Sequence, residues 1–190
     1  MTIAERIDDL SRFEKSLGEF LSALQKVDAT KGPQAGPHSF FRGGNLRTYD
    51  QETREALDQL RGLVDIERAL DVWDSALLSE WNQLPVWLHG DIAATNLLVT
   101  NGKLSAVIDF GCSAIGGPAC DLTIAWTFFS EASREVFREA VSLDRETWAR
   151  ARGWALWKAL ITLVEYQSTD ELKANDANRV IADVLADHER

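Results

Sequence analysis

Residues 86–111 read VWLHGDIAATNLLVTNGKLSAVIDFG. Short runs rich in branched residues predict strands at 86–88, 96–100 and 103–109. Between the last two runs, Asn101-Gly102 is the strongest short-range signal for a two-residue hairpin turn. We therefore expect a small β-hairpin near the middle of the chain, surrounded by the polar residues of this stretch.

A two-residue turn also sets which residues of the hairpin face each other. It predicts that Asn96 lies opposite Val107, with Asp109 as its diagonal neighbour on the same face. Asp91 projects from the loop before the hairpin toward the same edge. Taken singly, each of these polar residues is as typical of a structural turn or cap as of a binding site. Taken together, one amide oxygen and two carboxylates indicate a site for a hard cation.

Two other residue types in this region favour structural roles. His89 stands alone beside an acid, and such a histidine is more often a buried hydrogen-bonded residue than a catalytic base. Cys112 and Cys120 are too few for a disulfide framework or a tetrahedral cysteine site for zinc, so we expect free thiols.

Outside the hairpin the pattern is helical. Apolar residues recur at three- and four-residue steps and predict one long helix over 3–27. Shorter helices are predicted at 50–61, 65–80 and 170–188, and most of the chain after residue 120 also reads as helix. Residues 28–48 form a connection of a length that is often functional. Within it, Gly43-Gly44 has no strand before it and no helix after it, which predicts a turn and not a phosphate-binding loop.

Length and composition limit the function classes. The chain has 190 residues, 45% of them apolar, which suits one well-cored domain over 1–190. No apolar run is long enough to span a membrane, and the N-terminus lacks the features of a signal peptide, so we expect a cytoplasmic protein. A net charge of −10 argues against nucleic acid and anionic membranes as partners. It either attracts a small cationic molecule or only keeps the protein soluble.

The order of residues in the stretch resembles a known family. HGDIAATN, then a hairpin and VIDFG, is similar to the catalytic and metal loops of kinases. Gly90 stands where protein kinases carry arginine, and no Ala-Pro-Glu triplet follows. The pattern matches instead the aminoglycoside phosphotransferase family of small-molecule kinases, and GGPACDLTIAW resembles its Gly-x-Pro-x-x-Asp-Leu segment. The resemblance implies a mainly α fold of the α+β type, the protein-kinase-like C-terminal lobe, in which the β-hairpin carries the catalytic and metal loops.

The same resemblance implies roles for five residues. Asp91 is the catalytic aspartate, which accepts or orients the proton of the attacking hydroxyl. Asn96 and Asp109 are ligands of Mg²⁺ on the phosphates of ATP or GTP. His89 and Asp121 brace the catalytic loop through hydrogen bonds. The implied function is transfer of the γ-phosphoryl group to a hydroxyl of a small cationic acceptor such as an aminoglycoside, the chemistry of antibiotic resistance.

The front of the chain departs from this family. Complete kinases begin with a β-rich lobe that carries a phosphate-covering loop and a lysine for the phosphates. Here no lysine falls in a strand that precedes a helix, so the N-terminal β-rich lobe is expected to be absent. The chain then consists of helices and a long loop over 1–80, the catalytic and metal loops at 86–111, and a helical substrate-side region at 121–190. A missing N-terminal lobe becomes an expected partner, whether the chain is a truncation, a fragment or part of a split protein.

Alternatives remain open at this point. The chain could be a catalytically inactive remnant or binding module of a truncated kinase-like protein, or a metal-binding or scaffold domain on an unrelated helical fold. Nothing in the sequence indicates the oligomeric state. Acidic residues on the later helices are typical of solvated helix faces, but could also bind a cationic substrate. The candidates are Glu131, Glu135 and Glu165. The tryptophans favour core packing over an amine-binding cage, and those considered are Trp126, Trp148, Trp154 and Trp157.

Overall fold

The computed structural model describes residues 3–190, so residues 1 and 2 of the predicted segment 1–80 lie outside the described residues. The chain divides into two compact units, each assembled from two separated stretches. The first unit holds the described residues up to Gly44 together with Asn82–Asp144. The second holds Asn45–Trp81 together with Arg145–Arg190. A single domain over 1–190 stays a prediction.

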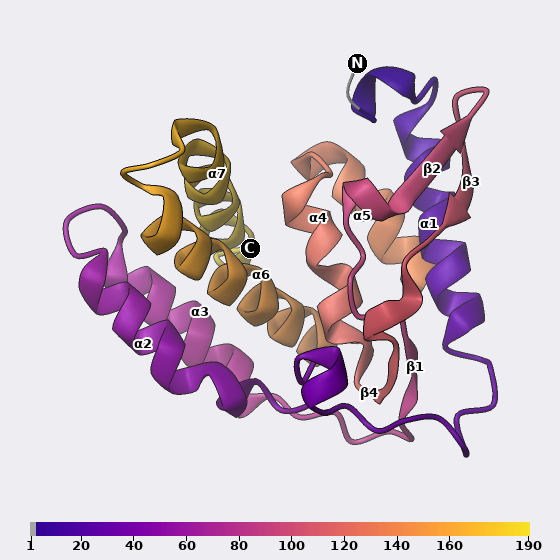
Figure 1. The fold of residues 1–190 in the computed structure, drawn as a ribbon, viewed down its shortest axis with the longest axis horizontal. Coiled ribbons are helices and arrows are strands. Elements are labelled where there is room, and N and C mark those ends of the chain that lie inside the picture. The colour runs from indigo at the N-terminus through magenta and orange to yellow at the C-terminus, as the bar shows by residue number, and fades with distance from the viewer. Residues whose placement is uncertain (1–2) are drawn as a thin grey trace. The chain divides into compact units, whose positions relative to one another are not determined.

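Helix α1, Leu10–Leu24, is the long helix of the N-terminal part of the chain (Figure 1), and it provides an apolar face for the first unit. The Asp9 carboxylate caps the helix by accepting a hydrogen bond from the Arg12 backbone N–H at 3.0 Å. The buried apolar side chains of α1 are those of Phe13, Leu17 and Leu21. The predicted helix over 3–27 is therefore wrong at both ends: the cap starts the helix later, and Val27, beyond its end, is 54% exposed.

Helix α5, Glu131–Val141, packs against α1 in the same unit. The two backbones approach closely because Gly18 has no side chain: a Cβ there would lie 2.5 Å from the Ala140 Cβ. The Ser22 hydroxyl donates to the carbonyl oxygen of Ala140 at 3.1 Å. Small residues and one hydrogen bond thus fix how α1 meets α5.

The strands of the first unit form two separate two-stranded sheets. The predicted hairpin is present: β2, Leu97–Thr100, pairs antiparallel with β3, Lys103–Val107. Asn101 and Gly102 both have positive φ, at 49° and 72°, as a primed hairpin turn requires. The second sheet, which the sequence did not predict, pairs β1, Val86–Leu88, with β4, Ala114–Gly116.

The register of the hairpin differs from the predicted one. Pairing follows the turn as far as Val99 and Leu104, and then a bulge shifts it, so that Leu97 lies opposite Val107. The bulge falls at Ser105, whose hydroxyl donates to the carbonyl oxygen of Leu98 at 3.0 Å. The extra residue moves Asn96 opposite Ile108 instead of Val107, and the Ile108 N–H donates to the Asn96 carbonyl oxygen at 2.9 Å.

The ends of the predicted strands are also corrected. Asn96 closes a short 3₁₀ turn, η4, Ala94–Asn96, and does not belong to the strand that follows. Strand β3 stops at Val107, because Asp109 takes a left-handed backbone conformation that a strand cannot include. Both residues therefore sit at the exits of the hairpin, where the side-chain direction is set by local turns and not by strand alternation.

The second unit is helical. Its long helices are α2 (Asp50–Gln59), α3 (Ile66–Leu78), α6 (Arg145–Tyr166) and α7 (Glu171–His188). Helix α6 packs against the other three and is buried along most of its length, as expected of a central helix (Figure 1). Arg152 of α6 and Asp187 of α7 form a buried ion pair at 3.2 Å. The predicted helices at 50–61, 65–80 and 170–188 are confirmed within two residues at each end.

The tryptophan prediction is confirmed as core packing. The exposed fractions of Trp126, Trp148, Trp154 and Trp157 are 0%, 5%, 3% and 7%. In the second unit Trp157 stacks on Tyr49 with ring centroids 4.0 Å apart. These rings fill the interior, so they are not available as a cage for an amine.

The predicted mainly helical fold with a small β-hairpin is confirmed, and the structure adds one further small sheet. Of the helices among residues 3–190, none combines the length and apolar character needed to cross a bilayer. Cys112 and Cys120 are free thiols, as predicted.

Leu17 and Leu10 provide a matched test of the core. Leu17 is fully buried, whereas Leu10 on the same helix is 37% exposed. We expect Leu17→Ala to lower the free energy of unfolding by about 2–5 kcal/mol, because it removes buried methyl groups and leaves a cavity. Leu10→Ala should lower it by less than about 1 kcal/mol. Urea unfolding measures both, and a loss below about 1 kcal/mol for Leu17→Ala as well would show that α1 is peripheral.

Glu14 predicts a dependence of stability on pH. It is buried in α1, and burial raises its pKa from 4.5 to about 6, with the Ser133 hydroxyl lowering it only in part. Between these values the folded state binds more protons than the unfolded state, so stability falls as pH rises through this window. Glu14→Gln should remove this fall and raise the free energy of unfolding at pH 7.5 by about 1–2 kcal/mol. Unchanged pH profiles of urea unfolding in the variant would contradict the assignment.

Candidate active site

The loop after β1 turns sharply at Gly90. Gly90 has a φ of +84°, and a Cβ at this position would overlap the carbonyl oxygen of Cys112. Only glycine accepts this combination of a left-handed backbone and a close neighbour. The Ser113 hydroxyl donates to the His89 carbonyl oxygen at 3.2 Å, which further ties the loop to the chain leading into β4. The turn directs the next residue, Asp91, out of the core.

The buried Asp121 side chain anchors the beginning of this loop through hydrogen bonds. It lies in the 3₁₀ turn η6, Pro118–Thr123, and is 1% exposed. Its carboxylate accepts one hydrogen bond from the backbone N–H of His89 and one from that of Gly90, both at 2.7 Å. Burial raises the pKa of Asp121, and the two N–H donors oppose the rise. The carboxylate thus satisfies two buried backbone donors outside regular secondary structure.

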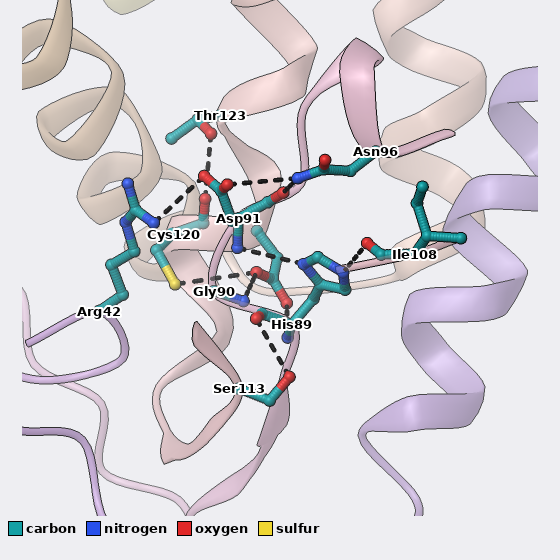
Figure 2. Close-up of polar contacts among 10 residues, drawn as sticks. Arg42, His89, Gly90, Asp91, Asn96, Ile108, Ser113, Cys120 and Thr123 are labelled. Carbon is teal, nitrogen blue, oxygen red and sulfur yellow. Dashed lines mark hydrogen bonds and ion pairs between the residues drawn. The ribbon is translucent and has the colours of Figure 1, made fainter. Parts of the chain in front are cut away.

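The His89 side chain connects two segments of the site. Its ring is fully buried; Nδ1 lies 3.2 Å from the Asp91 backbone nitrogen, and Nε2 lies 2.9 Å from the Ile108 carbonyl oxygen (Figure 2). A backbone N–H can only donate and a carbonyl can only accept, so the partners assign the neutral tautomer with the proton on Nε2. The ring of Phe110 packs against the imidazole, with the two ring centroids 4.6 Å apart.

Asn96 approaches Asp91 from the end of η4. Its side-chain nitrogen donates to the Asp91 carbonyl oxygen at 2.9 Å and to the Asp91 carboxylate at 3.2 Å. Both partners are acceptors, which fixes the orientation of the amide group. The amide oxygen of Asn96 consequently points away from Asp91 (Figure 2). The structure thus brings together two of the three predicted site residues through direct contact.

The position of Asp109, the third predicted site residue, is fixed by the hydrogen bonds of the residue before it, Ile108. Ile108 is bonded on one side to the Asn96 carbonyl and on the other to the His89 ring. Asp109 follows directly with φ of +64° and is exposed. A non-glycine residue in this conformation is uncommon and is often found at functional sites. The backbone therefore holds Asp109 beside the Asp91 loop, although not by the strand pairing that the sequence suggested.

Arg42 is a site residue that the sequence did not reveal. Its Nη1 lies 3.1 Å from the second carboxylate oxygen of Asp91 (Figure 2). The neighbouring Gly43-Gly44 forms the predicted turn, in which the Gly44 N–H donates to the Phe41 carbonyl oxygen at 2.9 Å. A loop arginine and a distant aspartate share no sequence spacing, so no sequence pattern could have joined them.

The oxygen donors suit magnesium better than a soft metal. Within the part of the chain that the structure describes, no three His, Cys, Asp or Glu side chains gather into a possible metal site. Mg²⁺ does not require such a cluster, because it is commonly bound through one or two carboxylates, with waters and substrate phosphates completing its coordination. An amide oxygen of Asn96 and the exposed carboxylate of Asp109 fit that description. Cys120 does not take part, since burial raises the pKa of its thiol well above the usual value.

A pocket of about 500 Å³ opens on the hairpin, and Asp91, Asn96 and Asp109 do not line it. Its lining is mixed: it includes the apolar Leu98, which is 45% exposed, and the charged Arg6 from the N-terminal segment. Ala94 and Thr95, which precede Asn96, also line it. A flat apolar group bound here would lie next to the Asn96 end of the site.

The weaker candidates lie on helices. Glu131 and Glu135 are on α5 of the first unit, and Glu135 pairs with Arg138 at 3.4 Å. Glu165 is on α6 of the second unit. All three are exposed. Their assignment to a substrate stays a prediction.

Solved structures with a similar fold are phosphotransferases. The GDP complex of wild-type aminoglycoside 2'-phosphotransferase-IIIa aligns with a TM-score of 0.62 at 19% identity, over 98% of this chain and 66% of that one. The GDP and kanamycin complex of an APH(2") enzyme gives 0.64 at 18%, over 94% and 63%. Macrolide 2'-phosphotransferase MphH from Brachybacterium faecium gives 0.55 at 18%, over 90% and 59%. At such identities the likeness shows the fold alone.

The remaining comparisons concern the sequence. No curated protein matches it. The family model described as "Phosphotransferase enzyme family" matches residues 2–154, which include the site loop, the hairpin, Asp109 and Asp121. Because this match covers most of the chain, and because the fold agrees, the chain belongs to the phosphotransferase enzyme family.

Proposed function

We propose that this chain carries the phosphoryl-transfer site of a small-molecule kinase. The reaction moves the γ-phosphoryl group of ATP or GTP to a hydroxyl of a small cationic acceptor, with aminoglycosides as the first class to test. The observation that carries the proposal is Asp91: a carboxylate whose side chain is 41% exposed, held by Asn96 and Arg42 at the tip of a loop that Asp121 anchors in the core.

The chemistry asked of the protein is modest. Phosphoryl transfer needs positioning and charge stabilisation more than covalent catalysis. In the proposed reaction Asp91 accepts a hydrogen bond from the acceptor hydroxyl, orients its oxygen toward the γ-phosphorus, and takes up the proton as the new O–P bond forms. The bond from the γ-phosphorus to the bridging oxygen breaks, and the nucleoside diphosphate leaves. Asn96 and Asp109 would hold Mg²⁺, which when bound neutralises negative charge on the phosphates.

The pocket on the hairpin supports a place for the nucleotide base. The exposed Leu98 in its lining suits a flat aromatic ring, Arg6 in the same lining adds a positive charge, and Ala94 and Thr95 of the lining lie just before Asn96 in the chain. The similar solved structures include complexes with GDP and with ADP, which supports a purine nucleotide as donor.

The acceptor class rests on two observations. Similar structures hold kanamycin, gentamicin and streptomycin, all of which are cationic. The net charge of −10 also favours a cationic ligand. An enzyme of this kind would act in the cytoplasm, where nucleoside triphosphates are available, and would confer antibiotic resistance.

The chain spans 66% or less of the length of each of the three structures compared above. The part of those proteins that it does not match could contribute to nucleotide binding. Of the lysines within residues 3–190, only Lys103 lies in a strand, and that strand belongs to the hairpin. We therefore propose that a β-rich lobe acts as partner in clamping the phosphates. An inactive remnant would instead show no turnover with such a lobe present.

Asp91→Asn tests the reaction. The substitution keeps the shape of the side chain but removes its charge and basicity, so turnover should fall by about 10²- to 10⁴-fold while nucleotide affinity changes little. The assay is acceptor-dependent ADP release with Mg²⁺, an aminoglycoside panel, and the chain alone or fused to a β-rich kinase lobe. Asp58→Asn is the control, because Asp58 lies in an exposed pair with Arg61. Equal turnover in Asp91→Asn and the wild type would refute the role of Asp91.

Asp109→Asn tests the metal assignment without loss of the fold. Removing one exposed carboxylate should weaken Mn²⁺ binding by about tenfold or more, since hard cations depend on charged oxygen ligands. Asn96→Ala should also weaken binding, although it releases Asp91 as well. Mn²⁺ titration followed by electron paramagnetic resonance gives the affinities, and circular dichroism checks the fold. If Asp109→Asn binds Mn²⁺ as tightly as Asp58→Asn, Asp109 is not a metal ligand.

A further inference from the structure

The segment 36–44, here named the Arg42 loop, is held together by its own hydrogen bonds and has an unusual backbone conformation. Phe40, Phe41 and Gly43 all have positive φ, at 49°, 54° and 86°. Two of these are bulky residues, for which this conformation is strained. The buried Ser39 hydroxyl bonds to both backbone groups of Gly36, accepting from its N–H at 3.2 Å and donating to its carbonyl at 3.1 Å.

The Arg42 loop is fixed against the strands that carry the site. The Gly117 N–H donates to the Gly43 carbonyl oxygen at 2.8 Å. A Cβ on Gly43 would overlap the side chain of Leu88, the last residue of β1 before His89. A Cβ on Gly116 would overlap the Gly43 carbonyl oxygen. The loop therefore packs directly on the strand ends from which the Asp91 loop leaves.

This loop presents one charged group, and that group meets Asp91. The Arg42 side chain is 20% exposed, and its Nη1 lies 3.1 Å from the Asp91 carboxylate (Figure 2). The carbon at the centre of its guanidinium lies 5.7 Å from the centroid of the Phe40 ring. Arg42 also lowers the pKa of the buried Asp121, in opposition to burial. A surface ion pair formed by chance would not need a strained loop, a buried serine and a stacked ring to hold it.

We propose that Arg42 is a positioning residue for the transfer reaction, an inference that rests on the proposed function. Arg42 holds one oxygen of the Asp91 carboxylate while Asn96 holds the other. Two separate contacts fix the rotation of the carboxylate, so that its remaining lone pairs face the acceptor hydroxyl. Without Arg42 the carboxylate keeps its charge and one contact but gains freedom to rotate, and reaction rates are sensitive to such small displacements.

Steady-state kinetics with an arginine series test this inference. Arg42→Ala should lower kcat by about 10- to 100-fold with the nucleotide KM within about twofold. Arg42→Lys should recover part of the loss, because lysine restores the charge but not the planar fork. Added methylguanidinium should partly restore Arg42→Ala but not Asp91→Asn. Arg61→Ala, which removes an exposed arginine paired with Asp58, is the control.

The outcomes separate this inference from the proposed function. If the wild type turns over and Arg42→Ala stays within twofold of it, or loses kcat that neither lysine nor methylguanidinium recovers, the positioning role is wrong while the function stands. If the wild type turns over no acceptor, either alone or fused to a β-rich kinase lobe, the proposed function fails. In that case urea unfolding of Arg42→Ala, Asp91→Asn and the double variant decides whether Arg42 holds Asp91. We expect the unfolding constants to depart from additivity by about fivefold or more; additive effects would overturn the inference.

Discussion

The site depends on one buried hydrogen-bonded unit, formed by Asp121 and His89. The Asp121 carboxylate accepts the N–H groups of residues 89 and 90, and the His89 ring then bonds the Asp91 N–H and the Ile108 carbonyl. These groups lie in loops, where no helix or sheet satisfies the backbone. The unit thus replaces regular secondary structure at the point where the chain must be irregular to expose Asp91.

Around this hydrogen-bonded unit, strained backbone conformations occur close to where the proposed reaction would take place. Asp109 has a positive φ, and the Arg42 loop adds Phe40 and Phe41. Such conformations persist only where the surroundings determine them fully. Here the packing of β1, β4 and the Arg42 loop provides that support. The polar groups at the tip can therefore be held in one arrangement while one face of Asp91 stays open to solvent.

The sequence predicted the parts of the site that follow chain order. The spacing of Asp91, Asn96 and Asp109 and the Asn101-Gly102 turn were recognisable because each depends on local chemistry. The register was wrong because the bulge at Ser105 comes from a hydroxyl bonding to the backbone, with no glycine or proline to mark it. Strand β4 has three residues and ends in glycine, so its pattern is too short to detect. The contact between Arg42 and Asp91 is long-range, and no local signal encodes it.

The central claim is that the Asp121 and His89 unit makes the site loop as rigid as the core. Native-state amide hydrogen exchange followed by NMR tests it most directly, because the claim names the acceptor of each amide. Four amides should exchange as slowly as that of Leu17 in α1: those of His89, Gly90, Asp91 and Ile108. Their exchange should require unfolding of the whole first compact unit of the chain. Exchange of these four amides as fast as that of exposed Lys31 would show that the loop opens freely, and would contradict the account.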